Sequence, residues 1–149
     1  MCTTITRDQA SDLAASLVEA QIAGPTDNVT IAGCNQLELL IALSNRGLRH
    51  ATCRDAKNGP HGGEPATDIL LIPDIDSETQ LSATVARLGH ELRQGGSIVA
   101  VTPPSDDARM TVRRVLVSCG FIEMHALTVA GGRTLVCARK PAAIAARAA

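Results

Sequence analysis

The 149-residue sequence has almost no aromatic side chains: Trp and Tyr are absent, and Phe121 is the single Phe. The hydrophobic core must therefore consist of aliphatic side chains, and little aromatic surface remains to stack on a base or on another planar ligand. A chain of this length is typical of one domain, which buries about two-thirds of the surface that the unfolded chain exposes. We expect one domain over residues 1–149, with an N-terminal helical segment at 1–24, a core at 28–140 and a tail at 141–149.

A surplus of one charge and long apolar runs are also lacking. The sequence contains 14 Lys and Arg against 15 Asp and Glu, a net charge of -1, whereas a nucleic-acid-binding domain normally carries a basic surplus. No apolar run approaches the roughly 18 residues of a membrane span. The segment Met1–Arg7 lacks the basic and apolar regions of a secretory signal. The sequence therefore predicts a cytoplasmic protein that binds neither nucleic acid nor a membrane.

Cysteine pairs with metal-binding spacing are missing as well. The 5 cysteines include no Cys-x-x-Cys pair, and free cysteines in a cytoplasmic chain are usually small buried hydrophobic residues. A metal site built from Cys53 with His50 or His61 would match no established zinc spacing. We therefore predict no metal site.

The pattern of apolar residues alternates between helices and buried strands. Apolar residues three or four apart indicate helices, short continuous apolar runs indicate buried strands, and glycines follow the ends of the helices. The hydroxyl of Ser77 can cap the third helix. The predicted helices cover residues 7–23, 36–46, 77–93 and 105–119, the predicted strands cover 29–32, 50–53, 68–72, 97–101, 121–129 and 133–138, and 55–66 is a predicted loop.

This order of elements predicts the fold class. Continuously apolar strands alternating with helices indicate a doubly wound α/β domain, whose mostly parallel sheet is covered on both faces. The last two strands flank Ala130-Gly131-Gly132, which predicts a C-terminal antiparallel hairpin at or near one edge of the sheet. We expect Met110 on the inner side of the fourth helix, together with Val112, Val115 and Leu116.

The most informative segment is Val29–Glu38, which passes from a strand to a helix through a turn built like a nucleotide-binding loop. Glycines in such a turn let the backbone approach an anionic or polar cofactor at the helix N-terminus. Here only Gly33 remains, and Asn35 and Leu37 stand where a second and a third glycine are expected. We expect Leu37 to be the first core residue of its helix and to fill part of a cofactor pocket. The cofactor loop is thus eroded.

Four segments in this order resemble the class I S-adenosylmethionine-dependent methyltransferases, with a Rossmann-like fold. They are Gly33-Cys34 with 40–47, then 68–72, then 88–101, and finally 115–121 with 135–140. The resemblance implies S-adenosylmethionine as a possible cofactor. It also implies a set of cofactor-binding positions, namely Gly33, Cys34, Asn35, Asp55 and Ile72. Asp74 and Asp76 follow the strand that ends at Ile72, and Asp74 is the candidate general base; a solvated turn with a helix N-terminus is the other interpretation.

The sequence departs from this family where the cofactor would bind. Family members usually carry an acidic residue two positions before the first glycine, and here that position is Ile31. A carboxylate at the end of the second strand typically binds the ribose hydroxyls, and the corresponding position is Arg54 or Asp55; only Asp55 could accept those hydrogen bonds. The segment between Asp55 and Asp68 is too short for a full strand and helix. The third β-α unit of the family is thus reduced to a loop.

Two functions follow from these departures. The first is a degenerate methyltransferase-like domain that acts as a binding, regulatory or partner subunit, as a homo-oligomer or with another protein. The second is an active methyltransferase on a small molecule. In that case the loop at Gly33 would hold the methionine part of the cofactor, Asp55 the ribose, and the loop around His61 the substrate, with Asp74 as the base. Another nucleotide in the same crevice is a third interpretation.

Overall fold

The computed structural model describes residues 6–32, 36–54, 67–75, 77–129 and 132–141. The helices are α1 (Arg7–Glu19), α2 (Leu37–Asn45), α3 (Glu78–Leu88), the short 3-10 helix η2 (Gly89–Glu91) and α4 (Asp106–Ser118). The strands are β1 (Asn28–Ala32), β2 (His50–Arg54), β3 (Thr67–Ile72), β4 (Leu92–Thr102), β5 (Ile122–Thr128) and β6 (Thr134–Arg139). They form one sheet in the order β2-β1-β3-β4-β6-β5.

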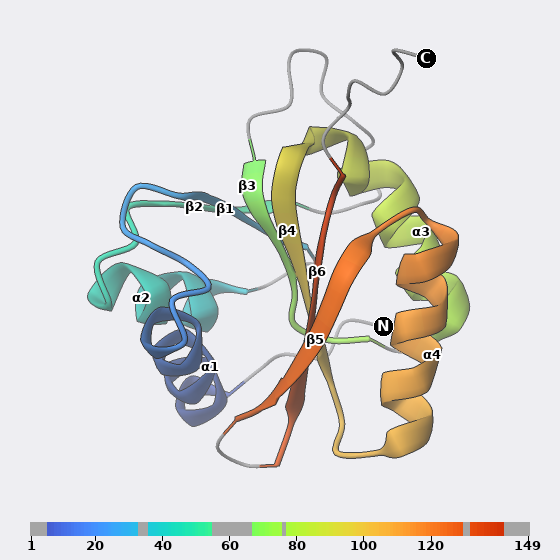
Figure 1. Ribbon diagram of the computed structural model, residues 1–149. Helices are drawn as coiled ribbons and strands as arrows, with labels where there is room; N and C mark the ends of the chain where they lie inside the picture. The colour runs from blue at the N-terminus through green and yellow to red at the C-terminus, as the bar shows by residue number, and fades with distance from the viewer. Residues whose placement is uncertain (1–5, 33–35, 55–66, 76, 130–131, 142–149) are drawn as a thin grey trace.

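The fold is the expected doubly wound α/β arrangement. The pairs β1–β2, β1–β3 and β3–β4 are parallel, and β6 runs antiparallel between β4 and β5. Helices α1 and α2 cover one face of the sheet, and α3 and α4 cover the other (Figure 1). The predicted terminal hairpin is therefore confirmed, with its antiparallel strand next to the edge strand β5.

The central strands are apolar throughout because both of their faces are covered. In β3, Ile69 and Leu71 belong to the hydrophobic cluster under α1 and α2, whereas Leu70 and Ile72 belong to the cluster under α3 and α4. Successive side chains of a strand point to opposite faces, so a strand buried on both faces needs an unbroken apolar run. The two clusters together form an aliphatic core in which Phe121 is the one aromatic member.

Helices α1, α3 and α4 each begin at a hydroxyl side chain that caps them. Ser77 caps α3 as predicted, because its Oγ accepts a hydrogen bond from the backbone N–H of Gln80 at 3.1 Å. Ser105 caps α4 in the same way. Thr6 and Gln9 form a reciprocal capping box at α1. These bonds satisfy backbone N–H groups that have no partner within the helix.

Two sequence-based boundaries were wrong. Helix α1 ends at Glu19 rather than at residue 23, and α3 ends at Leu88 rather than at Arg93. Leu92 instead begins β4 and is 0% exposed. The glycines expected to end the helix lie inside β4, at the point where its register with β3 shifts from the pair Thr67–Leu92 to the pair Ile69–Ser97. Gly95 adopts a positive φ of 82° there, which glycine tolerates without steric cost.

Two predicted core positions were also wrong. Met110 is 56% exposed and Leu37 is 61% exposed. Residues two apart in a helix point in nearly opposite directions. Because Val112 and Leu39 face the core, Met110 and Leu37 cannot face it as well. The part of the prediction that places Leu37 in a cofactor pocket involves the neighbouring residues 33–35, which lie outside the described residues, and stays a prediction.

A substitution at Gly96 tests how closely the backbone of β4 approaches its neighbours. A Cβ at this position would lie 2.7 Å from Leu92 Cδ1, 2.8 Å from the Arg93 oxygen and 2.9 Å from the Asp68 oxygen. We expect Gly96→Ala to lower the free energy of unfolding by about 1–3 kcal/mol, because two of these atoms belong to the backbone and cannot move aside easily. Urea denaturation measures this change.

Gly89→Ala is the matched control. Gly89 has an ordinary helical φ of -60°, and the nearest atom to a Cβ there is Val85 Cγ1 at 3.8 Å. This substitution should leave stability unchanged or raise it by about 0.4–1 kcal/mol. Equal losses in both variants would contradict the close approach at Gly96.

Candidate functional site

The parallel strands end together at one edge of the sheet, where open α/β sheets bind ligands. Ala32 is the last residue of β1 and pairs with Arg54, the last residue of β2. Strand β3 ends beside them at Ile72. Several predicted site residues lie outside the described part of the chain and stay predictions; they are Gly33, Cys34, Asn35, Asp55, His61 and Asp76.

Ile72 and Asp74 are the two predicted site positions that the structure describes. The Ile72 side chain is 1% exposed and packs in the cluster under α3 and α4, so only its backbone could meet a ligand at the edge. Asp74 is partly exposed and follows the buried Pro73. This places a carboxylate close to the end of β3. Its role as a base and the role of Ile72 in cofactor binding stay predictions.

Ile31 shows why the acidic residue of the family has no counterpart here. Its side chain is 0% exposed and packs in the cluster under α1 and α2. A carboxylate in that aliphatic environment would cost several kcal/mol unless it were paired. The position thus contributes to the core rather than to the chemistry of the edge.

Gln36 is a polar residue of this edge that sequence reasoning missed. It precedes α2 and is 4% exposed, but its side chain does not cap the helix. Its side-chain oxygen is buried and has no hydrogen-bond partner among the described residues. A buried amide oxygen without a partner costs about 1–3 kcal/mol. No local pattern indicates this position, because Gln is not a typical capping residue.

Cys53 lies next to Gln36 in space. Burial raises the pKa of the Cys53 thiol, and a hydrogen bond from the backbone of Gln36 offsets part of this rise. The thiol is therefore kept in its protonated, poorly nucleophilic form. Within the described ranges, no group of three or more His, Cys, Asp or Glu side chains is placed to hold a metal ion.

Arg54 occupies the end of β2 and is already paired. Its Nη2 lies 2.6 Å from Glu91 Oε1 and its Nε lies 3.2 Å from the same oxygen. The Arg54 and Glu91 side chains are 23% and 16% exposed, so this ion pair is more shielded than a surface pair. Glu91 comes from η2, far along the chain, and nothing in the local sequence indicates this contact. The end of β2 therefore presents a paired cation.

Comparison with solved structures identifies this arrangement. The chain superposes on PigF solved with SAH, with a TM-score of 0.66 over 90% of this chain and 56% of that one, at 13% identity. It also superposes on a SAM-dependent O-methyltransferase from Thermotoga maritima, with a TM-score of 0.63 over 93% of this chain and 67% of that one, at 15% identity. The fold is that of the class I S-adenosylmethionine-dependent methyltransferases.

These comparisons show a shared fold alone, because the sequence identities are low. Human N-acetylserotonin methyltransferase, solved with SAM, is 12% identical, with a TM-score of 0.60 over 91% of this chain. This chain spans 57% of that methyltransferase and 56% of PigF. No protein-family model and no curated protein matches the sequence significantly. In the described part of the chain, no helix is both long and apolar enough to cross a membrane.

Proposed function

We propose that this chain is a methyltransferase-like domain that does not catalyse methyl transfer and acts as a binding, regulatory or partner subunit. The observation that carries the proposal is the combination of Ile31 and Arg54 at the ends of neighbouring strands. One position holds a core side chain and the other holds a cation paired with Glu91. Ile31 supplies no carboxylate at the position where the methyltransferase resemblance implies one, and at the end of β2 only Asp55, which lies outside the described residues, could supply the other.

An exposed apolar surface supports a partner role. Leu37 and Ile41 are 61% and 46% exposed, and they lie four residues apart on α2, so they share one face of the helix. Side chains of this kind commonly anchor protein contacts when they cluster. Leu37 begins α2, close to the edge that would otherwise serve a cofactor, and Ile41 lies one turn further along the helix. We infer that a second copy of the chain covers this α2 face.

One observation favours the alternative, an active S-adenosylmethionine-dependent methyltransferase acting on a small molecule. The unpartnered oxygen of Gln36 lies at the N-terminus of α2, and a polar ligand there would supply the missing hydrogen bond. In this alternative, Gly33, Cys34 and Asn35 hold the methionine part, Asp55 the ribose, and Asp74 is the base. The two candidates differ in whether the cofactor binds.

Calorimetric titration with S-adenosylmethionine and S-adenosylhomocysteine separates them. We expect no binding heat with either compound up to millimolar concentration, because the positions at Ile31 and Arg54 offer no acceptor for the hydroxyls and ammonium of the cofactor. Micromolar binding that Asp55→Ala abolishes would contradict the proposal and support the active enzyme. Apart from cofactor binding, Asp55→Ala should have the same properties as the unmodified chain.

The partner role makes its own prediction about the α2 face. We expect the chain to self-associate at micromolar concentration, and Leu37→Glu with Ile41→Glu to shift it to the monomer, because two buried charges in an interface are costly. Sedimentation velocity measures the species present. Met110→Glu is the matched control, since Met110 is an equally exposed apolar residue on the opposite side of the sheet. A monomeric unmodified chain, or equal effects of both changes, would contradict self-association through α2.

A further inference from the structure

A separate cavity lies at the opposite edge of the sheet, between the end of α3 and the end of α4. Its volume is about 340 Å³, which falls at the small end of the range of about 300–1,000 Å³ for ligand sites. Helix α3 begins just after β3 and ends just before β4, so its last turn lies near the amino ends of the strands. The cavity thus lies toward the amino ends of β3 and β4 and away from Ala32 and Ile72. Its lining residues Gly89 and His90 directly precede Glu91, the partner of Arg54.

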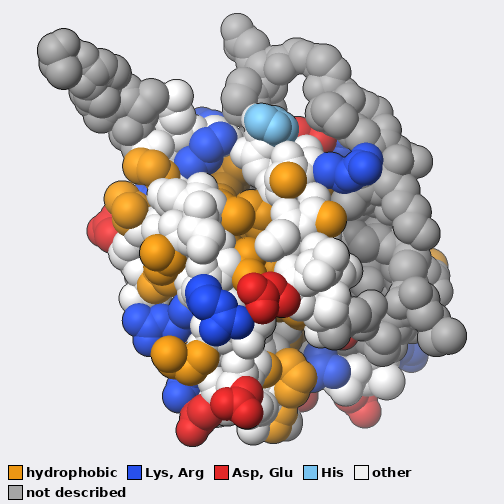
Figure 2. All heavy atoms as spheres, turned by 90° about the vertical axis from the view of Figure 1, so that its right-hand side faces the viewer, with side chains coloured by type: hydrophobic (Ala, Val, Ile, Leu, Met, Phe, Trp, Pro, Cys, Tyr) orange, Lys and Arg blue, Asp and Glu red, His pale blue; other side chains and the backbone are white. Residues whose placement is uncertain are grey.

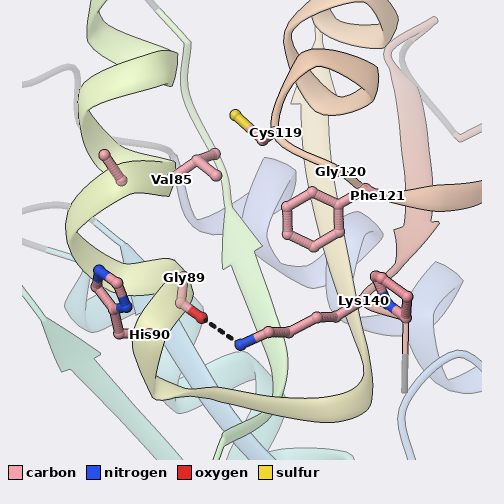
Figure 3. Close-up of a pocket in the computed structure, with 9 residues that line it drawn as sticks. Val85, Gly89, His90, Cys119, Gly120, Phe121 and Lys140 are labelled. Carbon is pink, nitrogen blue, oxygen red and sulfur yellow. Dashed lines mark hydrogen bonds between the residues drawn. The ribbon is translucent and has the colours of Figure 1, made fainter. Parts of the chain in front are cut away.

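The walls of the cavity are largely apolar. Val85 and Ala86 come from α3, and Phe121 follows α4. Gly120 adopts a φ of 93° at the end of α4, and the N–H of Phe121 then bonds to the Leu116 oxygen at 3.0 Å. This turn brings the one aromatic ring of the chain to the cavity. Figure 3 shows the ring of Phe121 between Cys119 and Lys140.

Lys140 supplies a cation at the floor of the cavity. Its Nζ donates to the Gly89 oxygen at 3.0 Å and to the Leu92 oxygen at 2.7 Å. An ammonium group has three N–H donors, so one donor has no partner among the described residues. Burial lowers the pKa of Lys140, which reflects a partly desolvated cation. Its backbone is held by bonds to Gly95 and Gly96, so its position is fixed.

Lys140 is the one charged side chain among the described residues that line the cavity. His90 lies on the rim near Gly89 (Figure 3), and none of the described residues that line the cavity is acidic. On the face that α3 and α4 form, apolar, basic and acidic side chains lie side by side (Figure 2), and the acidic ones include the ion-pair partners of Arg109 and Arg114. A cation with an unused donor, set against apolar walls, is complementary to an anion that carries a hydrocarbon group.

We propose that this cavity binds a small aliphatic carboxylate, with its hydrocarbon chain against Val85, Ala86 and Phe121 and its carboxylate on the ammonium group of Lys140. The site is independent of the proposed loss of methyl transfer, because it uses other residues at the other edge of the sheet. Lys140 also ties β6 to the end of α3 through the two carbonyl groups. If Lys140 served only to make these two hydrogen bonds, the cavity would not prefer a charged ligand over a neutral one.

Octanoate and octanol, each below its aggregation limit, are the probes that separate these roles. We expect octanoate to bind with one-to-one stoichiometry in calorimetry, and octanol to bind at least about tenfold more weakly because it cannot accept a charge-assisted hydrogen bond. Lys140→Met should weaken the binding of octanoate by a similar factor and leave the binding of octanol unchanged. Arg113→Met, which removes a cation outside the cavity, is the matched control and should bind both probes normally.

A second variant keeps the test decisive if Lys140→Met fails to fold. Ala86 is exposed on α3 and lines the cavity, so Ala86→Phe should fill the space and abolish octanoate binding without disturbing the core. Ala83→Phe adds the same ring at an exposed position of α3 outside the cavity and should not affect binding. The proposal is overturned by no binding at millimolar octanoate, by equal binding of both probes, or by equal effects of the two Phe variants.

Discussion

The burial of both faces of the central strands is the constraint on which the rest of this structure depends. Strands β1, β3, β4 and β6 each send alternate side chains into the two clusters on either side of the sheet. Each fully buried Leu, Ile or Val contributes about 1.5–3 kcal/mol, so neither face can be left open. The helices α1 and α2 on one side and α3 and α4 on the other satisfy this requirement. The chain therefore keeps a methyltransferase-like fold through its core alone.

The same constraint separates the fold from the chemistry at its edges. Ile31 faces the core, where an aliphatic side chain strengthens the fold and a carboxylate would weaken it. Arg54 pairs with Glu91 and links β2 to the turn before β4. Ile31 thus serves stability at a position where the family resemblance implies cofactor chemistry, and Arg54 does so at one of the two candidate ribose positions, the other being Asp55. Among the described residues, polar features outside this pair include the unpartnered side-chain oxygen of Gln36 and the ammonium of Lys140.

The sequence predicted the central strands well because they contain short unbroken apolar runs, as at Ile69–Ile72, and such runs have one stable environment in an α/β fold. It failed where local pattern and tertiary packing disagree. The segment from Gly89 to Arg93 continues a helical pattern, but burial of Leu92 in the sheet starts a strand there. The cavity at Lys140 was beyond prediction because its lining comes from three distant parts of the chain. The ion pair of Arg54 is unpredictable for the same reason.

Hydrogen–deuterium exchange with and without saturating S-adenosylhomocysteine tests the central claim most directly, namely that the fold is retained while the cofactor edge is not. The account predicts unchanged protection of the amides from Gln36 to Leu39 and at Cys53 and Arg54. Slower exchange confined to these amides would show that the edge still holds the cofactor. That result would contradict the account and identify the chain as a binder of S-adenosylmethionine.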